Sequence, residues 1–288
     1  MGKKIGIILS IVVVALVVVY FVATSIVENK IADVVDAKIN NSKLKITYDK
    51  ISTSLISSKT TIYGIKYDEI KINEIVVKDI YSYDQKSAIP SNLNIEVNGI
   101  LFSPKKINPM YAKTLNDIGY GENMVLDYGL NYSYDKEKKS LNIKDFKVDF
   151  HDAFKTNLKL NIENLNLNLN DPGSMVQLVF LYPTLKIKNA ALSYTEDSFL
   201  KRVIEVDSKK RGKTVEDIKA EVVKAMDMKI KLAKNETQKK FFEGFKNFLM
   251  DPQSFNVTIS PDKPVAIKDI MKERNPDNII TKLNMKFE

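Results

Sequence analysis

The spacing of apolar residues changes three times along the chain. Residues 5–27 form an apolar run without a charge. From residue 43 to about residue 194, apolar and polar positions alternate with a period of two, which is typical of strands with one buried face. Helical spacing follows over 197–250, and alternation returns over 254–288. The pattern therefore predicts an α+β fold: an N-terminal transmembrane helix, then a curved antiparallel β-sheet (a meander) with helices packed on it.

The clearest strand pair is predicted at 126–134 and 141–150, joined by the charged turn 135–139. Apolar side chains in these strands alternate with Asp, Asn, Ser and Lys, so one face is expected to be buried. A third strand of the same kind is predicted from residue 158 to residue 169. The side chains expected to line the apolar face are Leu126, Tyr128, Leu130, Phe146, Val148, Leu165 and Leu167.

Apolar spacing widens from two residues to three at four places in the predicted strands. These places are Tyr48/Ile51, Ile72/Ile75, Ile143/Phe146 and Ile162/Leu165. The apolar side chains stay on one face only if an extra residue is absorbed, as in a β-bulge, which bends and twists the strand. Four bulges predict a strongly curved sheet. Breaks between shorter strands are the competing interpretation.

The run at 5–27 is long enough to cross a bilayer, because a helix of this length extends about 34 Å. Lys3 and Lys4 precede it, whereas the charges between residues 28 and 38 sum to minus one. The positive side of a span stays in the cytoplasm. The expected organisation is a cytoplasmic tail (1–4), a transmembrane helix (5–27) and a periplasmic domain (28–288) of a single-pass inner-membrane protein. Cleavage of a signal peptide near residue 25 is the alternative, although the run is longer than a usual signal core.

The amino-acid composition excludes thiol chemistry and the common histidine-based metal motifs. The chain has no cysteine and one histidine, His151, and it carries a net charge of +8. Disulfides and thiol nucleophiles are excluded, and no histidine pair has the spacing of a zinc motif. Phosphate-binding glycine loops and the nucleophile-elbow motif are also absent from the sequence. We therefore expect no enzyme, no catalytic residue, no cofactor and no metal.

Charged residues in two regions have a simpler interpretation than a site. Asp145, Asp149 and Asp152 lie close together in sequence, but their strand positions are explained by solvation. Residues 201–246 contain fourteen Lys or Arg and eight Asp or Glu. A solvated helix face explains this excess, and attraction to anionic lipid headgroups is the alternative. Nucleic acid is not expected as a partner, because the domain is predicted to lie outside the cytoplasm.

The chain resembles a group of bacterial envelope proteins. An apolar N-terminal run followed by KLKITYDKISTSLISSKTTIYGIKYDEIKINEIVVKDI is similar to the opening of AsmA-like and YdgA-like envelope proteins of Gram-negative bacteria. The later segments LDYGLNYSYDKEKKSLNIKDFKVDF and DPQSFNVTISPDKPV resemble YdgA-like periplasmic domains. For AsmA-like proteins, the resemblance implies lipid handling through a curved apolar β-groove. No binding residue carries over, since no family motif matches here.

Two functions remain open at this point. In the first, the apolar sheet face holds lipid or another hydrophobic ligand. In the second, the helices over 199–249 fill that face, and the protein is a structural or assembly partner in the envelope. Periodicity does not separate the two, because a core and a groove need the same side chains.

Overall fold

A computed structural model describes residues 46–54, 56–67, 70–80, 90–103, 109–121, 123–170 and 181–288. These residues divide into two compact units. Unit 1 takes the described residues of Met1–Ser133, Lys147–His151 and Asn168–Ser174, and unit 2 takes those of Tyr134–Phe146, Asp152–Leu167 and Met175–Glu288.

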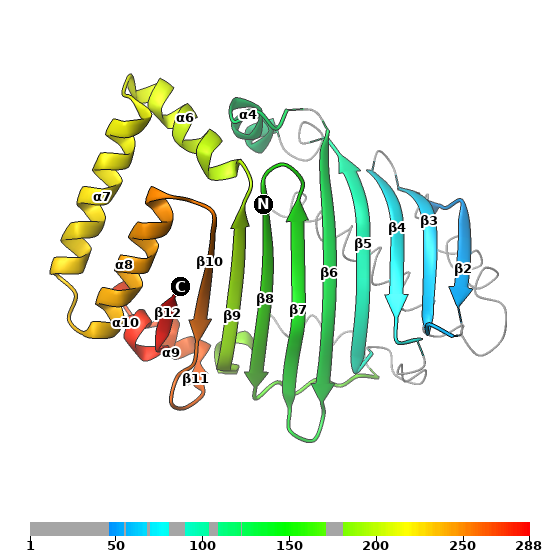
Figure 1. The fold of residues 1–288 in the computed structure, drawn as a ribbon. Helices are drawn as coiled ribbons and strands as arrows, with labels where there is room; N and C mark the ends of the chain where they lie inside the picture. Colours follow the sequence, from blue (N-terminus) through cyan, green and yellow to red (C-terminus); the bar gives the residue numbers. More distant parts are fainter. Residues whose placement is uncertain are drawn as a thin grey trace. The chain divides into compact units, whose positions relative to one another are not determined.

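The described residues form mainly one antiparallel sheet of twelve strands (Figure 1). The strands are β1 (Ile46–Thr47), β2 (Lys50–Ser54), β3 (Lys59–Tyr67), β4 (Ile70–Lys78), β5 (Asn92–Phe102), β6 (Met124–Asp135), β7 (Ser140–Phe150), β8 (Phe154–Glu163), β9 (Lys186–Glu196), β10 (Ser254–Ile259), β11 (Val265–Ala266) and β12 (Met285–Phe287). Their order is β1-β3-β4-β5-β6-β7-β8-β9-β10-β12, with β2 beside β3 and β11 beside β9.

The helices are fewer than the strands. Those described are α4 (Pro109–Asp117), the 3₁₀ helix η2 (Tyr182–Thr184), α6 (Phe199–Arg211), α7 (Val215–Lys231), α8 (Glu236–Met250), α9 (Ile267–Met271) and α10 (Pro276–Lys282). Thr214 starts α7 with a capping box, because its hydroxyl accepts from the Asp217 N–H while the Asp217 carboxylate accepts from the Thr214 N–H. Gly212 ends α6 in the left-handed conformation, with φ of 62°.

The core of unit 1 is the apolar face of β3, β4 and β5. Ile75 of β4 lies opposite Ile62 of β3 on one side and Val97 of β5 on the other. The exposed fractions of Ile75 and Val97 are 0% and that of Ile62 is 1%. Branched side chains suit such a face, since they pack well on a pleated surface.

An irregular line crosses three neighbouring strands of unit 1. In each strand two buried apolar residues are three positions apart and not two. The pairs are Ile62/Ile65 in β3, Ile72/Ile75 in β4 and Val97/Ile100 in β5, and they enclose Gly64, Asn73 and Gly99 respectively. Both glycines have positive φ angles, 64° and 66°. The register between β5 and β6 shifts from Val97 to Ile100, which marks a bulge at Gly99. Together these irregularities keep the apolar residues on the buried face.

The four predicted spacing breaks have different outcomes. Tyr48/Ile51 is the break between β1 and β2, so the chain-break interpretation holds there. Ile72/Ile75 lies on the irregular line, but the register of β4 with β3 is the same on both sides of it. Ile143/Phe146 falls inside β7. At Ile162/Leu165 the strand has already ended, and the register shift lies at Asn161/Ile162 instead.

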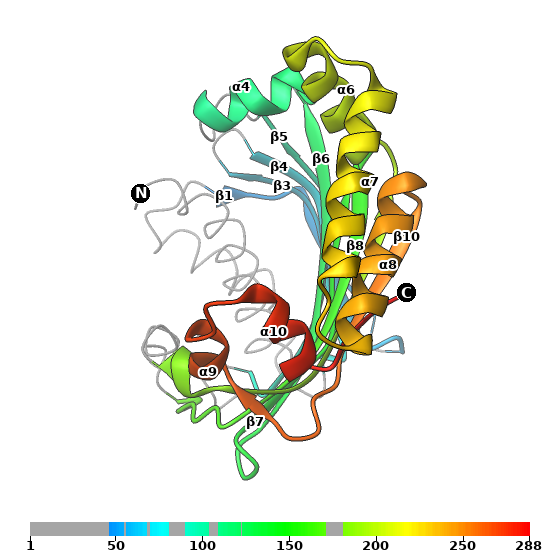
Figure 2. The ribbon, with the colours of Figure 1, turned by 90° about the vertical axis from the view of Figure 1, so that its left-hand side faces the viewer.

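Unit 2 is held by aromatic packing between α8 and the strands β9, β10 and β12. Phe287 of β12 stacks on Phe255 of β10 with ring centroids 4.9 Å apart, and it contacts Phe241 and Phe245 of α8 at 5.6 and 5.5 Å. Phe248 of α8 lies 4.8 Å from Phe255. Figure 2 shows α7 and α8 side by side in this unit. The phenylalanine side chains of α8 therefore pack in the core of unit 2.

The α+β class with a leading transmembrane helix is wrong for the described residues. They are mainly a large antiparallel sheet, and the C-terminal strands belong to it, because β10 pairs with β9 and β12 pairs with β10. Alternation in a sequence shows which side chains share a face, but it does not show which strands are neighbours. The helices are consequently a smaller part of the fold than expected.

The expectation of a single-pass inner-membrane protein is likewise corrected. Within the described ranges, no helix combines the length and apolarity that a membrane span requires. The longest of them, α7, has 17 residues and carries Glu216 and Asp217 in its first turn. The predicted tail (1–4) and span (5–27) lie outside the described residues.

Candidate functional site

The seven residues predicted to line one apolar face belong to two compact units. Leu126, Tyr128 and Leu130 pack, partly buried, against the core of unit 1, and Val148 also belongs to this unit. Unit 2 contains the other three, Phe146, Leu165 and Leu167. The predicted set is thus divided between two compact units.

Leu165 and Leu167 have a structural role that explains their burial. Both lie beyond the end of β8. The hydroxyl of Tyr134 donates to the carbonyl oxygen of Leu165 at 2.9 Å and accepts from the Leu167 N–H at 3.0 Å. The backbone of this segment is therefore fixed to Tyr134 at the end of β6.

The apolar face of unit 1 is a filled core. Side chains of β3, β4 and β5 on this face have exposed fractions near zero. Tyr128 of β6 packs against this face, and desolvation by burial raises its pKa to about 12.

Among the described residues of unit 2, two cavities lie beside α7, and neither is lined by a predicted site residue. One, of about 290 Å³, lies between α6, α7 and the end of β9, and Ile204, Val215 and Pro252 line it together with charged side chains. The other, of about 480 Å³, lies along α7 and is lined by Ala220, Val223 and Met250 and by charged side chains. Charged side chains line both cavities in number, among them Glu205 and Lys219 in the first and Lys224 and Asp227 in the second, and no ligand class is indicated by these linings.

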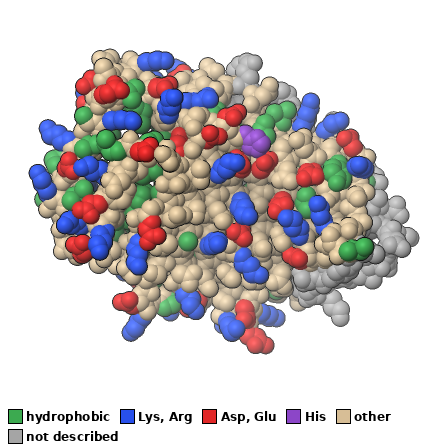
Figure 3. Space-filling view, in the orientation of Figure 1, with side chains coloured by type: hydrophobic (Ala, Val, Ile, Leu, Met, Phe, Trp, Pro, Cys, Tyr) green, Lys and Arg blue, Asp and Glu red, His purple; other side chains and the backbone are tan. Residues whose placement is uncertain are grey.

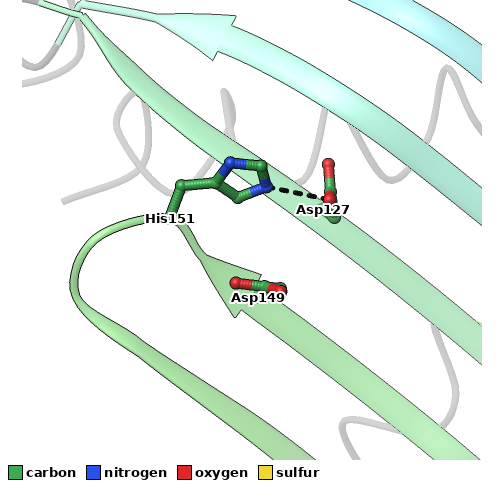
Figure 4. Close-up of side chains that lie close together, drawn as sticks. All are labelled: Asp127, Asp149 and His151. Carbon is green, nitrogen blue, oxygen red and sulfur yellow. Dashed lines mark hydrogen bonds and ion pairs between the residues drawn. The ribbon is translucent and has the colours of Figure 1, made fainter. Parts of the chain in front are cut away.

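Three side chains with metal-binding atoms converge in unit 1 (Figure 4). Asp127 lies in β6, Asp149 lies in β7, and His151 follows the end of β7. One ligand atom from each lies within 4.8 Å of the others. The hairpin brings these residues together although 24 positions separate Asp127 from His151.

Hydrogen bonds hold two members of this cluster in place. His151 Nε2 and Asp127 Oδ2 are 2.9 Å apart, and the other carboxylate oxygen, Oδ1, accepts from the Gly99 N–H at 2.6 Å. The backbone N–H of His151 donates to the carbonyl oxygen of Val125 at 3.1 Å. The end of β7 is therefore tied to β6 beside the cluster.

The cluster is accessible from solvent. The exposed fractions of the His151 and Asp127 side chains are 44% and 32%. The chain's single histidine is visible on the surface in Figure 3, next to acidic side chains. One imidazole and two carboxylates can coordinate a divalent metal ion through three atoms, which leaves open positions for water.

The strand pattern alone does not predict this grouping. It places Asp127 on the polar side of the hairpin, and it groups Asp149 with Asp145 and Asp152 by sequence distance. In the structure Asp145 belongs to unit 2, where its carboxylate accepts from the side chain of Asn157 at 3.0 Å. The turn at 135–139 could have revealed this grouping. If the two strands are paired outward from this turn, Asp127 falls opposite residues next to Asp149.

Comparison with known proteins gives similarity without an activity. A family described as "Uncharacterized protein" matches residues 147–288. An "Uncharacterized protein" of Aquifex aeolicus (strain VF5) is 24% identical over 216 residues, which covers 68% of this chain and 72% of that protein. The family match includes Asp149 and His151 but begins after Asp127.

Proposed function

We propose that this protein is a non-catalytic β-sheet protein that binds a divalent transition-metal ion, with Zn²⁺ as the best match, at Asp127, Asp149 and His151. The observation that carries the proposal is the convergence of three ligand atoms within 4.8 Å. Imidazole nitrogen suits zinc and its neighbours in the first transition row, whereas calcium and magnesium prefer sites made of oxygen alone.

Small movements are enough to complete the site. Ligand atoms around a tetrahedral zinc ion lie about 3.3 Å apart, given metal–ligand distances of about 2.0–2.2 Å. The most widely separated ligand atoms, at most 4.8 Å apart, must therefore approach by up to about 1.5 Å, whereas His151 Nε2 and Asp127 Oδ2, 2.9 Å apart, must separate slightly. Rotation about side-chain χ angles provides movements of this size. A bound ion would replace the direct contact between His151 Nε2 and Asp127 Oδ2, and it would neutralise charge at the cluster.

Such an ion would cross-link β6 and β7. Asp127 and Asp149 lie on different strands, so coordination by both joins the strands through the metal as well as through the backbone. Anything that binds the folded chain and not the unfolded chain stabilises the fold by mass action. This role agrees with the second of the two functions left open by the sequence, a structural or assembly role.

Isothermal titration of the full chain with ZnCl₂ tests the proposal. We expect one ion per chain, and we expect His151→Gln and Asp149→Asn to weaken binding by at least about tenfold. Asp145→Asn is the matched control, because Asp145 also lies in β7 and bonds to Asn157. The proposal fails if the wild-type chain takes up no zinc, or if the control loses as much affinity as the two ligand variants.

Binding of lipid or another hydrophobic ligand stays a separate prediction. Its basis is the resemblance to AsmA-like and YdgA-like proteins, together with the apolar face of the sheet. The burial of that face in unit 1 favours a filled core over an open groove. Enlargement of the core residue Val97 to phenylalanine distinguishes these alternatives.

A further inference from the structure

Asp127 is anchored from a strand that carries none of the three proposed ligands. Gly99 lies in β5, next to β6, and its N–H points to Asp127 Oδ1 at a distance of 2.6 Å. This bond occupies one carboxylate oxygen and leaves the other, Oδ2, beside His151. The bond fixes the rotation of the carboxylate, which decides the direction in which Asp127 presents its second oxygen.

The backbone at Gly99 makes this bond possible. Its φ angle is 66°, in the left-handed region that glycine adopts without strain. The register shift between Val97 and Ile100 turns the local backbone away from regular pairing with β6. A bulge commonly re-aims a group beside a functional site in this way. The N–H that would otherwise pair along the strand therefore points to a side chain.

A side chain at position 99 would disturb this arrangement. An added Cβ would lie 2.1 Å from Asn73 Nδ2 and 2.5 Å from Asn73 Cγ. Asn73 is exposed, so it can move, but the positive φ angle would remain strained for any residue with a Cβ. Relief of that strain changes the direction of the N–H.

We infer that Gly99 is a positioning residue for the cation site, and this inference rests on the proposed function. Gly99 acts through Asp127 by holding its carboxylate in the orientation that suits coordination. Partners that orient metal ligands typically contribute 10–100-fold to metal affinity. A substitution that displaces the Gly99 N–H should therefore weaken Zn²⁺ binding by about 10–100-fold while the three proposed ligands remain.

Gly64 offers a matched control within the same unit. Its φ angle is 64°, and an added Cβ would lie 1.9 Å from Asp49 Oδ2. The backbone strain and the clash with an exposed polar side chain are thus similar to those at Gly99. Gly64 lies in β3, however, and β4 and β5 separate that strand from β6. Gly64→Ala should therefore share the cost in stability but not the loss of affinity.

The test compares full chains of the wild type, Gly99→Ala and Gly64→Ala. Zn²⁺ affinity is measured by competition with a chromophoric chelator, and ligand geometry is monitored by the visible absorption of bound Co²⁺. We expect the 10–100-fold loss and an altered Co²⁺ spectrum for Gly99→Ala alone. Equal affinities and spectra for the two variants would overturn the inference. A wild-type chain that binds neither metal would instead refute the proposed function.

A measurement on the wild-type chain covers the case in which Gly99→Ala fails to fold. The amide signals of Gly99 and Gly64 are followed by NMR during titration with Zn²⁺. We expect the Gly99 signal to shift, because its acceptor becomes a metal ligand, while the Gly64 signal changes little. Zinc binding that leaves the Gly99 amide as unaffected as that of Gly64 would overturn the inference.

Discussion

The hydroxyl of Tyr134 makes two hydrogen bonds to the segment that follows β8: it donates to the Leu165 carbonyl oxygen and accepts from the Leu167 N–H. All three residues are buried. A buried carbonyl or N–H without a partner costs about 1–3 kcal/mol, so a single hydroxyl stabilises two groups that would otherwise be unsatisfied.

Tyr134→Phe should therefore lower the free energy of unfolding by about 1–3 kcal/mol or somewhat more, measured by urea denaturation. Tyr132→Phe is the control. Its hydroxyl donates one bond, to the Pro90 carbonyl, in a partly buried position. The control should lose less. Equal losses would mean that the Tyr134 bonds contribute nothing beyond an ordinary phenol contact.

Enlargement of a core residue distinguishes a filled face from a groove. Val97, with no exposed surface, lies between strands on both sides. Val97→Phe should cost about 1–3 kcal/mol by overpacking, measured by thermal or chemical denaturation. Leu126→Phe, at a half-buried position, should cost less. If Val97→Phe left stability unchanged, the face would have free space, and the hydrophobic-ligand hypothesis would gain support.

Replacement of Gly244 by alanine should destabilise the protein, although helix propensity alone favours alanine. Alanine in a helix is normally favoured over glycine by about 1 kcal/mol. At Gly244 of α8, however, an added Cβ would lie 2.7 Å from the Phe287 carbonyl oxygen and 2.9 Å from its ring. Gly244→Ala should therefore lower the melting temperature. A rise in melting temperature would show that α8 moves away from β12 at little cost.

Acidic pH should destabilise the junction of α6 and α7. Hydrogen bonds from Lys213 and Arg211 lower the pKa of Glu221, and bonds from Thr214 lower the pKa of Asp217. A lowered pKa in the folded state gives stability that is present above the unfolded pKa, near 4, and is lost as pH falls through the folded value.

The melting temperature of the wild type should accordingly fall more steeply below about pH 4 than that of Glu221→Gln. The reason is that glutamine has no carboxylate to protonate. Both proteins should respond alike between pH 6 and pH 8, where the carboxylates stay ionised. Parallel curves at acidic pH would show that these exposed ion pairs contribute no pH-dependent stability.

The hairpin was the most predictable part of the fold. Strands expected at 126–134 and 141–150 correspond to β6 and β7, which differ from them by at most two residues at each end. Alternation and a charged turn are both local signals. Leu165 and Leu167 also alternate, yet they are not in a strand. The hydroxyl of Tyr134 binds the Leu165 carbonyl and the Leu167 N–H, and the Leu165 N–H donates to the carbonyl oxygen of Lys139 in the turn.

The candidate site was less predictable because it depends on strand neighbours. Gly99 stands 28 positions before Asp127, and a bulge in β5 aims its N–H at that carboxylate. The apolar spacing from Val97 to Ile100 records the bulge. It does not record which side chain of the adjacent strand the N–H will meet. Sequence distance therefore grouped Asp149 with the wrong carboxylates.

The contacts of the Phe287 ring indicate which elements of unit 2 unfold together. This side chain lies in a strand of only three residues, yet it contacts rings from both α8 and β10. A short strand joined to a helix in this way has little protection of its own. We expect the amides of α8 and β12 to exchange with solvent at a common rate, as one cooperative segment that unfolds below the global transition.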